Sequence, residues 1–187
     1  MKIIKDIKDS TREWFLKRAH KKVARNKKLL GYSQVKNLGI LYDASEEHNY
    51  RHIVQLVKKL QDDQKKVKTM GFVNQKKRPD YCFPQLVYDF CDAKSFAWNQ
   101  KPTAQNVKDF IDAEYDLLID LTPSDFHLVK YLCAISKARM KTGRYVEKYI
   151  DIYDLMLQVD DNNSIEETSS QVIHYLKMIN NGPASKE

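Results

Sequence analysis

The sequence predicts an α/β protein with a single Rossmann-like, mostly parallel sheet, helices on both faces, and a basic helix ahead of it. Two segments carry this prediction: residues 38–45 (Leu-Gly-Ile-Leu-Tyr-Asp-Ala-Ser) and residues 115–123 (Tyr-Asp-Leu-Leu-Ile-Asp-Leu-Thr-Pro). Each is a short apolar run closed by residues that begin turns or helices, which is typical of a buried strand leading into a helix. Repeated strand-then-helix units indicate a mostly parallel sheet that is covered on both faces.

The amino-terminal segment is predicted to be one basic helix. Asp9 and Ser10 can cap it, neither Gly nor Pro interrupts residues 11–30, and Gly31 would end it. Its apolar side chains form one narrow stripe, so the helix would dock by one face. The basic residues that cover the rest of it are Lys17, Arg18, Lys21, Lys22, Arg25, Lys27 and Lys28.

The body of the protein is predicted to open with a βαβ unit. Residues 38–42 form its first strand, and Ser45 caps a helix that ends near Asp62. Residues 66–73 return as the second strand. Residues 74–102 are less regular, and their aromatic, alternating pieces indicate short strands or a hairpin.

The second half of the chain repeats the pattern of strands and helices. Residues 103–113 are expected to be helical, and residues 116–121 form the next strand. Pro123 then takes the first position of a helix that continues to Ser136. The last expected elements are strands at 138–141 and 155–159 and a helix capped by Ser164.

The composition is typical of one soluble globular domain. The chain has 187 residues, of which 42% are hydrophobic and 30% are charged, enough for one buried α/β core but not for two. No apolar run approaches the roughly 20 residues of a membrane span, and charges interrupt the amino terminus too often for a signal peptide. We therefore expect a cytoplasmic protein. Its three cysteines, an odd number without a CxxC pair, are expected to be reduced.

Positive charge is concentrated at the amino terminus. The net charge is +7, and residues 1–36 hold 12 Lys and Arg against 3 Asp and Glu, whereas residues 37–187 hold 20 against 22. A basic segment on a near-neutral body is typical of contact with RNA or with an anionic membrane surface. A solvated helix face explains the same charges. The chain is thus divided into a basic helical arm (1–36), a Rossmann-like domain (37–181) and a disordered tail (182–187).

A ligand site is expected at the carboxyl ends of the strands, where open α/β sheets bind their ligands. Helix starts after Ser45 and Thr122 would add N–H groups for an anion such as phosphate. The simpler interpretation makes Ser45 and Thr122 helix caps, and residues 76–78 a solvated turn. The candidate ligand-binding residues are Asp43, Ser45, Asn74, Gln75, Lys76, Lys77, Arg78, Asp120, Thr122 and Arg144.

The sequence lacks the specific motifs of nucleotide-binding, metal-binding and catalytic sites. Neither GxGxxG nor GxxxxGK[ST] follows the first strand, which disfavours nucleotide binding by the usual routes. His48 and His52 have the spacing of a helical metal pair but lack the glutamate of HExxH. Asp43 and Asp120 could pair for acid/base work if their strands are neighbours, although aspartate after a strand commonly begins a turn. We predict no catalytic residue, no metal and no cofactor.

Two resemblances extend these inferences. Residues 38–44, 71–77, 115–121 and 134–145 together resemble a family of small uncharacterised proteins of Bacteroidetes, which implies no activity. Residues 115–121 and then Ser-Lys-Ala-Arg-Met-Lys-Thr-Gly-Arg-Tyr at 136–145 are similar to the strand, helix and SGAKxRIG strand in the amino-terminal half of heptosyltransferase-like glycosyltransferases. The Gly-Asp of that family is missing from the first strand, as is a second Rossmann domain, so this likeness implies the fold rather than glycosyl transfer.

The leading functional hypothesis is a non-catalytic domain whose basic helix binds RNA or a ribonucleoprotein through the phosphates. The alternative is binding or transfer of a small phosphorylated or sugar-like ligand at the strand ends. There the cations after the second and fifth strands would hold the anion, and Asp43 or Asp120 would act as acid or base. A third hypothesis is a scaffold whose helix docks on another protein through Trp14 and Phe15.

Overall fold

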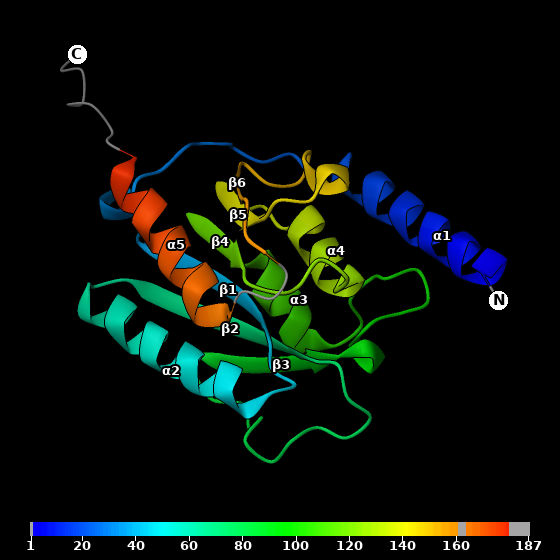
Figure 1. The fold of residues 1–187 in the computed structure, drawn as a ribbon, viewed down its shortest axis with the longest axis horizontal. Helices are drawn as coiled ribbons and strands as arrows, with labels where there is room; N and C mark the ends of the chain where they lie inside the picture. Colours follow the sequence, from blue (N-terminus) through cyan, green and yellow to red (C-terminus); the bar gives the residue numbers. More distant parts are fainter. Residues whose placement is uncertain (1, 161–163, 180–187) are drawn as a thin grey trace.

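The computed structural model describes residues 2–160 and 164–179, and it contains one six-stranded parallel sheet (Figure 1). The strand order is β3-β2-β1-β4-β5-β6, so the order reverses between β1 and β4. This is the doubly wound Rossmann order, which confirms the predicted fold class. The strands are β1 (Asn37–Asp43), β2 (Lys66–Val73), β3 (Tyr88–Asp92), β4 (Leu117–Asp120), β5 (Met140–Arg144) and β6 (Leu155–Leu157).

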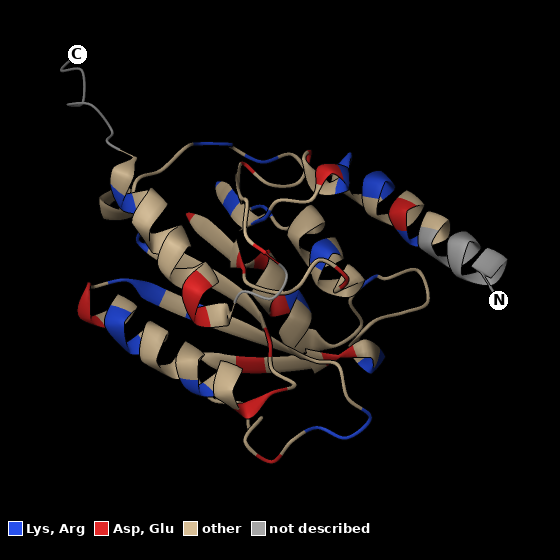
Figure 2. Ribbon diagram, viewed as in Figure 1, with Lys and Arg blue, Asp and Glu red and all other residues tan. Residues whose placement is uncertain are grey.

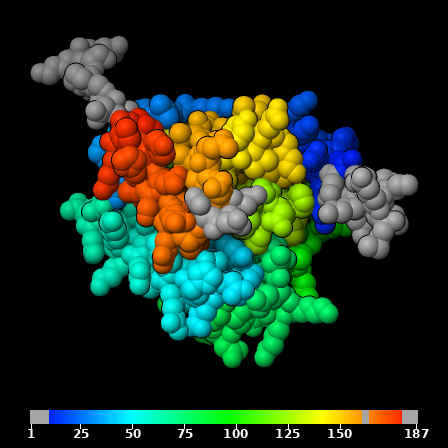
Figure 3. Space-filling view, in the orientation of Figure 1, coloured from blue at the N-terminus to red at the C-terminus, as the bar shows by residue number. Residues whose placement is uncertain are grey.

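Helices cover both faces of the sheet, as the burial of the strands requires. The helices are α1 (Lys2–His20), α2 (Glu47–Asp62), α3 (Gln105–Asp112), α4 (His127–Ile135) and α5 (Ile165–Met178). Helices α2 and α5 lie side by side over one face (Figures 1 and 3). Helices α3 and α4 cover the other face, and α1 packs on α4 from outside.

Two hydrophobic cores follow from the period-2 alternation of the strands. In β1, Ile40 points into the core beneath α2 and α5, whereas Leu41 points into the core beneath α3 and α4. Leu16 places α1 in this second core, and Leu30 places the segment after α1 in the first. The amino-terminal 36 residues are therefore packed against the body at both of these points.

The basic segment is only partly helical, which corrects the prediction of a helix to about Leu30. Helix α1 ends at His20, and the chain then runs in a non-helical path to residue 31. The Lys28 N–H donates to the carbonyl of Arg139 over 3.0 Å, and Leu30 is buried. Helix propensity favoured a longer helix, but these contacts with the body form only when the chain is extended.

The starts of three helices also differ from prediction. Helix α1 begins at Lys2, so Asp9 and Ser10 lie within the helix instead of capping it. Helix α2 begins at Glu47 without a side-chain cap, because the hydroxyl of Ser45 instead accepts the N–H of Asn74 over 2.9 Å. Helix α4 begins at His127 rather than at Pro123. The N–H and hydroxyl of Thr122 both donate to Asp120, so Thr122 is not a helix cap either.

Most other predicted elements are confirmed within a residue or two, but β5 begins two residues and ends three residues later than the predicted 138–141. Strand β2 has the predicted bounds, and Ser164 caps α5 through a capping box with Glu167. Of the two alternatives for residues 74–102, the structure confirms a short strand: β3 pairs with β2 in parallel, and an isolated antiparallel bridge joins Phe96 to Pro102. The predicted disordered tail at 182–187 lies outside the described residues.

Candidate functional site

The ends of β1 and β2 bring four of the predicted ligand-binding residues together. Asp43 is half-buried and accepts the N–H of Ser45 over 2.9 Å. The hydroxyl of Ser45 accepts the N–H of Asn74, and its carbonyl accepts Nε2 of Gln75, each over 2.9 Å. These bonds tie the two strand ends into one polar turn, although they occupy the groups that would otherwise contact a ligand.

Asp120 at the end of β4 is the centre of a closed polar cluster. Its Oδ2 accepts Lys130 Nζ over 2.7 Å and the Tyr153 hydroxyl over 2.5 Å. Its Oδ1 accepts the hydroxyl and the N–H of Thr122 over 2.6 and 2.9 Å. Asp120, Thr122 and Lys130 are all buried. The cluster therefore joins β4 to α4 and to the segment before β6 without an opening to solvent.

The electrostatics of this cluster favour an ionised Asp120. Burial alone raises the pKa of its carboxyl group, but the charge of Lys130 and the hydrogen bonds from Lys130, Thr122 and Tyr153 outweigh burial and lower the pKa below its ordinary value. Register places Asp120 opposite Leu41, so Asp43 lies two residues further along the neighbouring strand. With Asp120 enclosed and Asp43 engaged in a turn, the structure shows no open carboxylate pair at this position.

The predicted anion-binding cations lie on different parts of the molecule. Lys76, Lys77 and Arg78 are exposed on the loop after β2, and Arg78 forms a 3.9 Å ion pair with Asp92. Arg144 is buried at the end of β5, where it donates to the carbonyl of Asp160 and to the hydroxyl of Thr168. Strands β1 and β4 separate β2 from β5, so these cations do not share one pocket.

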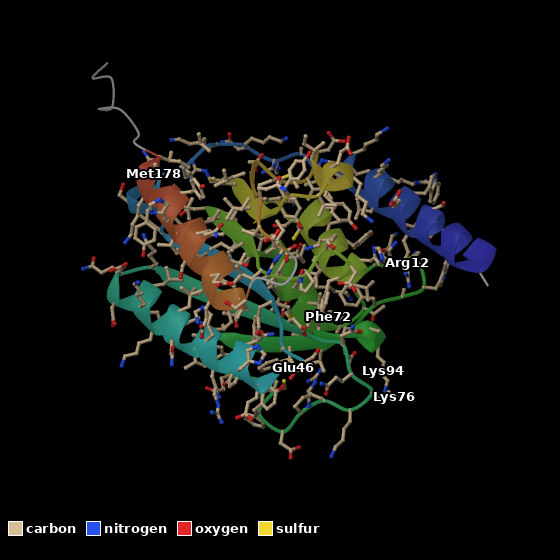
Figure 4. The ribbon with its side chains drawn as sticks, in the orientation of Figure 1. Arg12, Glu46, Phe72, Lys76, Lys94 and Met178 are labelled. Carbon is tan, nitrogen blue, oxygen red and sulfur yellow. The ribbon has the colours of Figure 1, made fainter. Side chains whose placement is uncertain are left out.

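A cavity of about 450 Å³ lies at the carboxyl ends of β2 and β3, between the start of α4 and one side of α1. Figure 4 shows Arg12 from α1 and Phe72 from β2 on this side of the molecule. Of the residues predicted for a ligand site, Asn74 lines it. Its aromatic lining is Phe72, Phe96, Trp98 and Phe126, and its polar lining is Arg12, Asn74, Gln100, Asp125 and His127.

Gln100 is the most unusual residue of this cavity. Its side chain is only 4% exposed, and its backbone has φ 67°, in the left-handed region that residues other than glycine seldom adopt. Nε2 donates to the carbonyl of Arg12 over 3.0 Å, which fixes the orientation of the amide. Oε1 has no hydrogen-bond partner among the described residues. A residue that lines the cavity therefore carries a buried acceptor without a donor among the described residues.

A second hollow of about 370 Å³ runs between α1, residues 99–101 and α4, and we call it the basic aromatic groove. It is lined by Trp14, Phe15, Arg18, Ala19, Lys22, Asn99, Lys101 and Tyr131. The guanidinium of Arg18 lies 5.1 Å from the ring centre of Trp14, and Phe15 meets Trp98 edge to face at 5.5 Å. Trp98 lines the cavity, so the groove and the cavity adjoin through this aromatic pair.

Most of the predicted nucleic-acid-binding cations lie on the surface. Lys17, Arg18, Lys21, Lys22, Lys27 and Lys28 are exposed, and within residues 2–160 and 164–179 none of them forms an ion pair with an acidic side chain. Figure 2 shows the basic residues at the end of α1 and along the segment that follows it. Arg25 differs, because its guanidinium is buried against Asp154 in a bidentate ion pair.

Sequence reasoning missed the cavity and the residues that distinguish it. Gln100 and Trp98 belong to an irregular segment without a motif, and Arg12 reaches the cavity only because α1 folds back onto the body. The local sequence offered only a tryptophan followed by Asn, Gln and Lys at 98–101. That short sequence does not reveal which helices and strands would surround Trp98 and Gln100.

Packing explains the remaining groups with possible chemistry, which are His52 and the three cysteines. Nε2 of His52 hydrogen-bonds the hydroxyl of Ser169 over 2.9 Å, and burial lowers the pKa of His52 despite nearby Glu166. In the described part of the chain, no three His, Cys, Asp or Glu side chains gather as metal ligands. Burial raises the pKa of all three cysteines, which are free thiols.

Fold and site together define a Rossmann-like α/β domain with an additional basic helix packed beside the carboxyl ends of its strands. The chain belongs to the family described as "Family of unknown function (DUF6913)", which matches residues 8–179. This confirms the expected membership of an uncharacterised family. The chain matches none of the curated proteins and none of the solved structures with which it was compared. Among the helices of the described residues, none has the length and apolar character needed to cross a membrane.

Proposed function

We propose that this protein is a non-catalytic RNA-binding domain of the cytoplasm, which contacts RNA or a ribonucleoprotein through the basic surface of α1 and the segment after it. The observation that carries the proposal is the set of six exposed cations that have no acidic partner among the described residues and lie beside or near the basic aromatic groove. Unpaired lysines and arginines can neutralise phosphates, and they release counterions when they do so. Such contacts position RNA without reading its sequence.

The aromatic residues of the groove favour RNA over a membrane surface. Trp14 is 52% exposed and Trp98 is 86% exposed, so both offer aromatic surface to a base. Cations interleaved with exposed aromatic rings are the usual composition of single-strand binding surfaces. An interfacial membrane helix would instead need a broad apolar face, whereas the apolar side of α1 around Leu16 is buried in the protein.

Charge reversal at two adjacent lysines tests the proposal directly. Lys21→Glu/Lys22→Glu should weaken binding of a labelled RNA at low salt at least tenfold, as measured by fluorescence anisotropy. The matched control is Lys58→Glu/Lys59→Glu, two exposed adjacent lysines on α2 that change the net charge equally. Equal loss in both variants would show a general charge effect and contradict the proposal. Removal of the arm is a poorer test, because Leu16, Leu30 and Val35 are buried.

The second candidate function is binding of a small phosphorylated or sugar-like ligand at the strand ends. The cavity of about 450 Å³ favours it, because its volume is that of a ligand pocket and Arg12 lines it. The local likeness to heptosyltransferase-like glycosyltransferases belongs with this candidate. Ligand binding should then persist in Lys21→Glu/Lys22→Glu, and inorganic phosphate or sugar phosphates should raise the melting temperature of both proteins.

A further inference from the structure

We infer that the cavity at the ends of β2 and β3 holds one unpaired nucleobase of the RNA, so that the preferred partner is single-stranded. The inference rests on the proposed function, which it deepens by assigning a part of the RNA to a part of the protein. A base within a duplex is stacked on both faces and paired along one edge, whereas a base in a single strand can leave its neighbours and enter a pocket.

The walls of the cavity suit a flat aromatic ligand. The ring of Phe72 lies 6.4 Å from that of Phe96 and 5.7 Å from that of Phe126, which makes an aromatic floor over the end of β2. Trp98 at the side is 86% exposed, so its indole can cover an inserted ring. Stacking of bases on aromatic side chains is a main source of single-strand affinity.

Gln100 supplies the polar contact that a nucleobase would complete. Its Oε1 is buried, faces no donor among the described residues, and belongs to a residue that lines the cavity. The amino and imino groups of a nucleobase edge are N–H donors of the kind this acceptor lacks. The left-handed backbone at Gln100, φ 67°, is a strained conformation of the type that clusters at ligand sites.

The basic aromatic groove continues from the cavity and gives the phosphates a path. Phe15 contacts Trp98 at the boundary, and Arg18, Lys22 and Lys101 line the groove beyond it. Asp125 is the single acidic residue among the described residues that line either hollow. A base in the cavity would therefore leave its sugar-phosphate chain beside three cations on α1 and the 99–101 segment.

The test compares an unstructured RNA of about 12 nucleotides with the duplex of the same sequence, using the full chain and fluorescence anisotropy. Wild-type protein should bind the single strand at least tenfold more tightly. Trp98→Ala should reduce single-strand affinity about tenfold and leave duplex affinity unchanged. Phe83→Ala, which removes an aromatic side chain that is 70% exposed and lies outside both hollows, should change neither affinity.

A second variant tests the hydrogen-bond acceptor of Gln100 separately from stacking on Trp98. Gln100→Asn retains an amide and tolerates the left-handed backbone, but its shorter side chain withdraws the acceptor, so single-strand affinity should fall about fivefold. Trp98 is exposed, so Trp98→Ala is informative even if Gln100→Asn fails to fold. Equal affinities for both RNAs, with Trp98→Ala unchanged and Lys21→Glu/Lys22→Glu weakened, would overturn the inference and leave the proposed function intact. Binding of neither RNA at low salt would overturn both.

Discussion

Arg25 and Asp154 form a bidentate ion pair in which two guanidinium nitrogens each lie 2.6 Å from a carboxylate oxygen. Arg25 also donates to the carbonyl of Ala138 over 3.2 Å, and Asp154 accepts the N–H of Lys141 over 2.9 Å. The pair thus fixes the segment after α1 to the region before β6. Because Arg25 lies between Lys22 and Lys27, its ion pair with Asp154 also holds the basic surface in a fixed position on the body.

Loss of this ion pair should lower the stability of the whole domain. We expect Arg25→Ala to reduce the free energy of unfolding by about 2 kcal/mol, because it removes charged hydrogen bonds and leaves Asp154 without its partner. Urea unfolding followed by circular dichroism measures the change. Arg51→Ala is the control, since its ion pair with Glu47 is exposed and should contribute less than about 0.5 kcal/mol. Similar losses in both variants would contradict the role assigned to Arg25.

The buried cluster around Asp120 predicts a large and pH-dependent effect. Asp120→Asn leaves Lys130 buried without its counter-charge, so we expect a loss of about 3–5 kcal/mol near neutral pH. The folded state holds the pKa of Asp120 below its ordinary value, so the stabilisation is present above about pH 4 and is lost as the pH falls through the folded pKa. The difference in unfolding free energy between wild type and Asp120→Asn should therefore become smaller at acid pH.

Asp43→Asn is the matched control for this prediction. Asp43 is half-buried and accepts one backbone N–H, which an Asn side-chain oxygen can also accept. The expected loss is below about 1 kcal/mol. If chemical denaturation gave equal losses for the two Asp→Asn variants, the enclosed ion pair would not be the stabilising feature.

Lys141 predicts a second rise of stability with pH, in the same direction as that from Asp120 but at alkaline pH. Burial is the main reason that the pKa of Lys141 is lowered from 10.5 to about 8, and its Nζ donates to the carbonyl of Cys133 over 2.6 Å. Between pH 8 and 10.5 the unfolded chain binds a proton that the folded protein has released, so this group adds stability as the pH rises. We expect wild-type stability to gain roughly 3 kcal/mol relative to Lys141→Met over this range, measured by urea unfolding. A stability difference between wild type and Lys141→Met that stays constant over this pH range would contradict the prediction.

Gly71 in the middle of β2 has no room for a side chain. A Cβ atom there would lie 2.7 Å from Cβ of Ala44 and 2.9 Å from the rings of both Phe90 and Tyr42. Gly71→Ala should therefore destabilise the protein by about 1–3 kcal/mol through overpacking. Thermal unfolding measures this, and an unchanged melting temperature would show that the two rings can move aside.

Local patterns were sufficient to predict β1, β2 and β4 closely, but not the bounds of β3 or the contacts between distant segments. Residues 66–73 formed the predicted strand because their alternation, followed by a buried run from Thr69 to Val73, is specified by the local sequence. The end of α1 at His20 could not be read locally, because extension of the next residues is stabilised by Asp154 and Arg139 far along the chain. Propensity alone favoured a continued helix there.

The difference between local patterns and distant contacts also explains why only some of the predicted ligand-binding residues lie together. Asp43, Ser45 and Asn74 came together because parallel strands end at one edge of a sheet. Arg144 did not join them, because its side chain lies on the α5 face and is bound to Thr168. The cavity beside Gln100 depends on where α1 docks, which periodicity does not specify.

The salt dependence of RNA binding tests the central claim most directly. Binding of single-stranded RNA to the full protein is measured from 50 to 200 mM salt. If about four of the exposed cations of the α1 surface neutralise phosphates, affinity should fall roughly 50-fold across this range, and Lys21→Glu/Lys22→Glu should show a shallower slope. Affinity that persists unchanged at high salt, or an equal slope in that variant, would contradict binding through this surface.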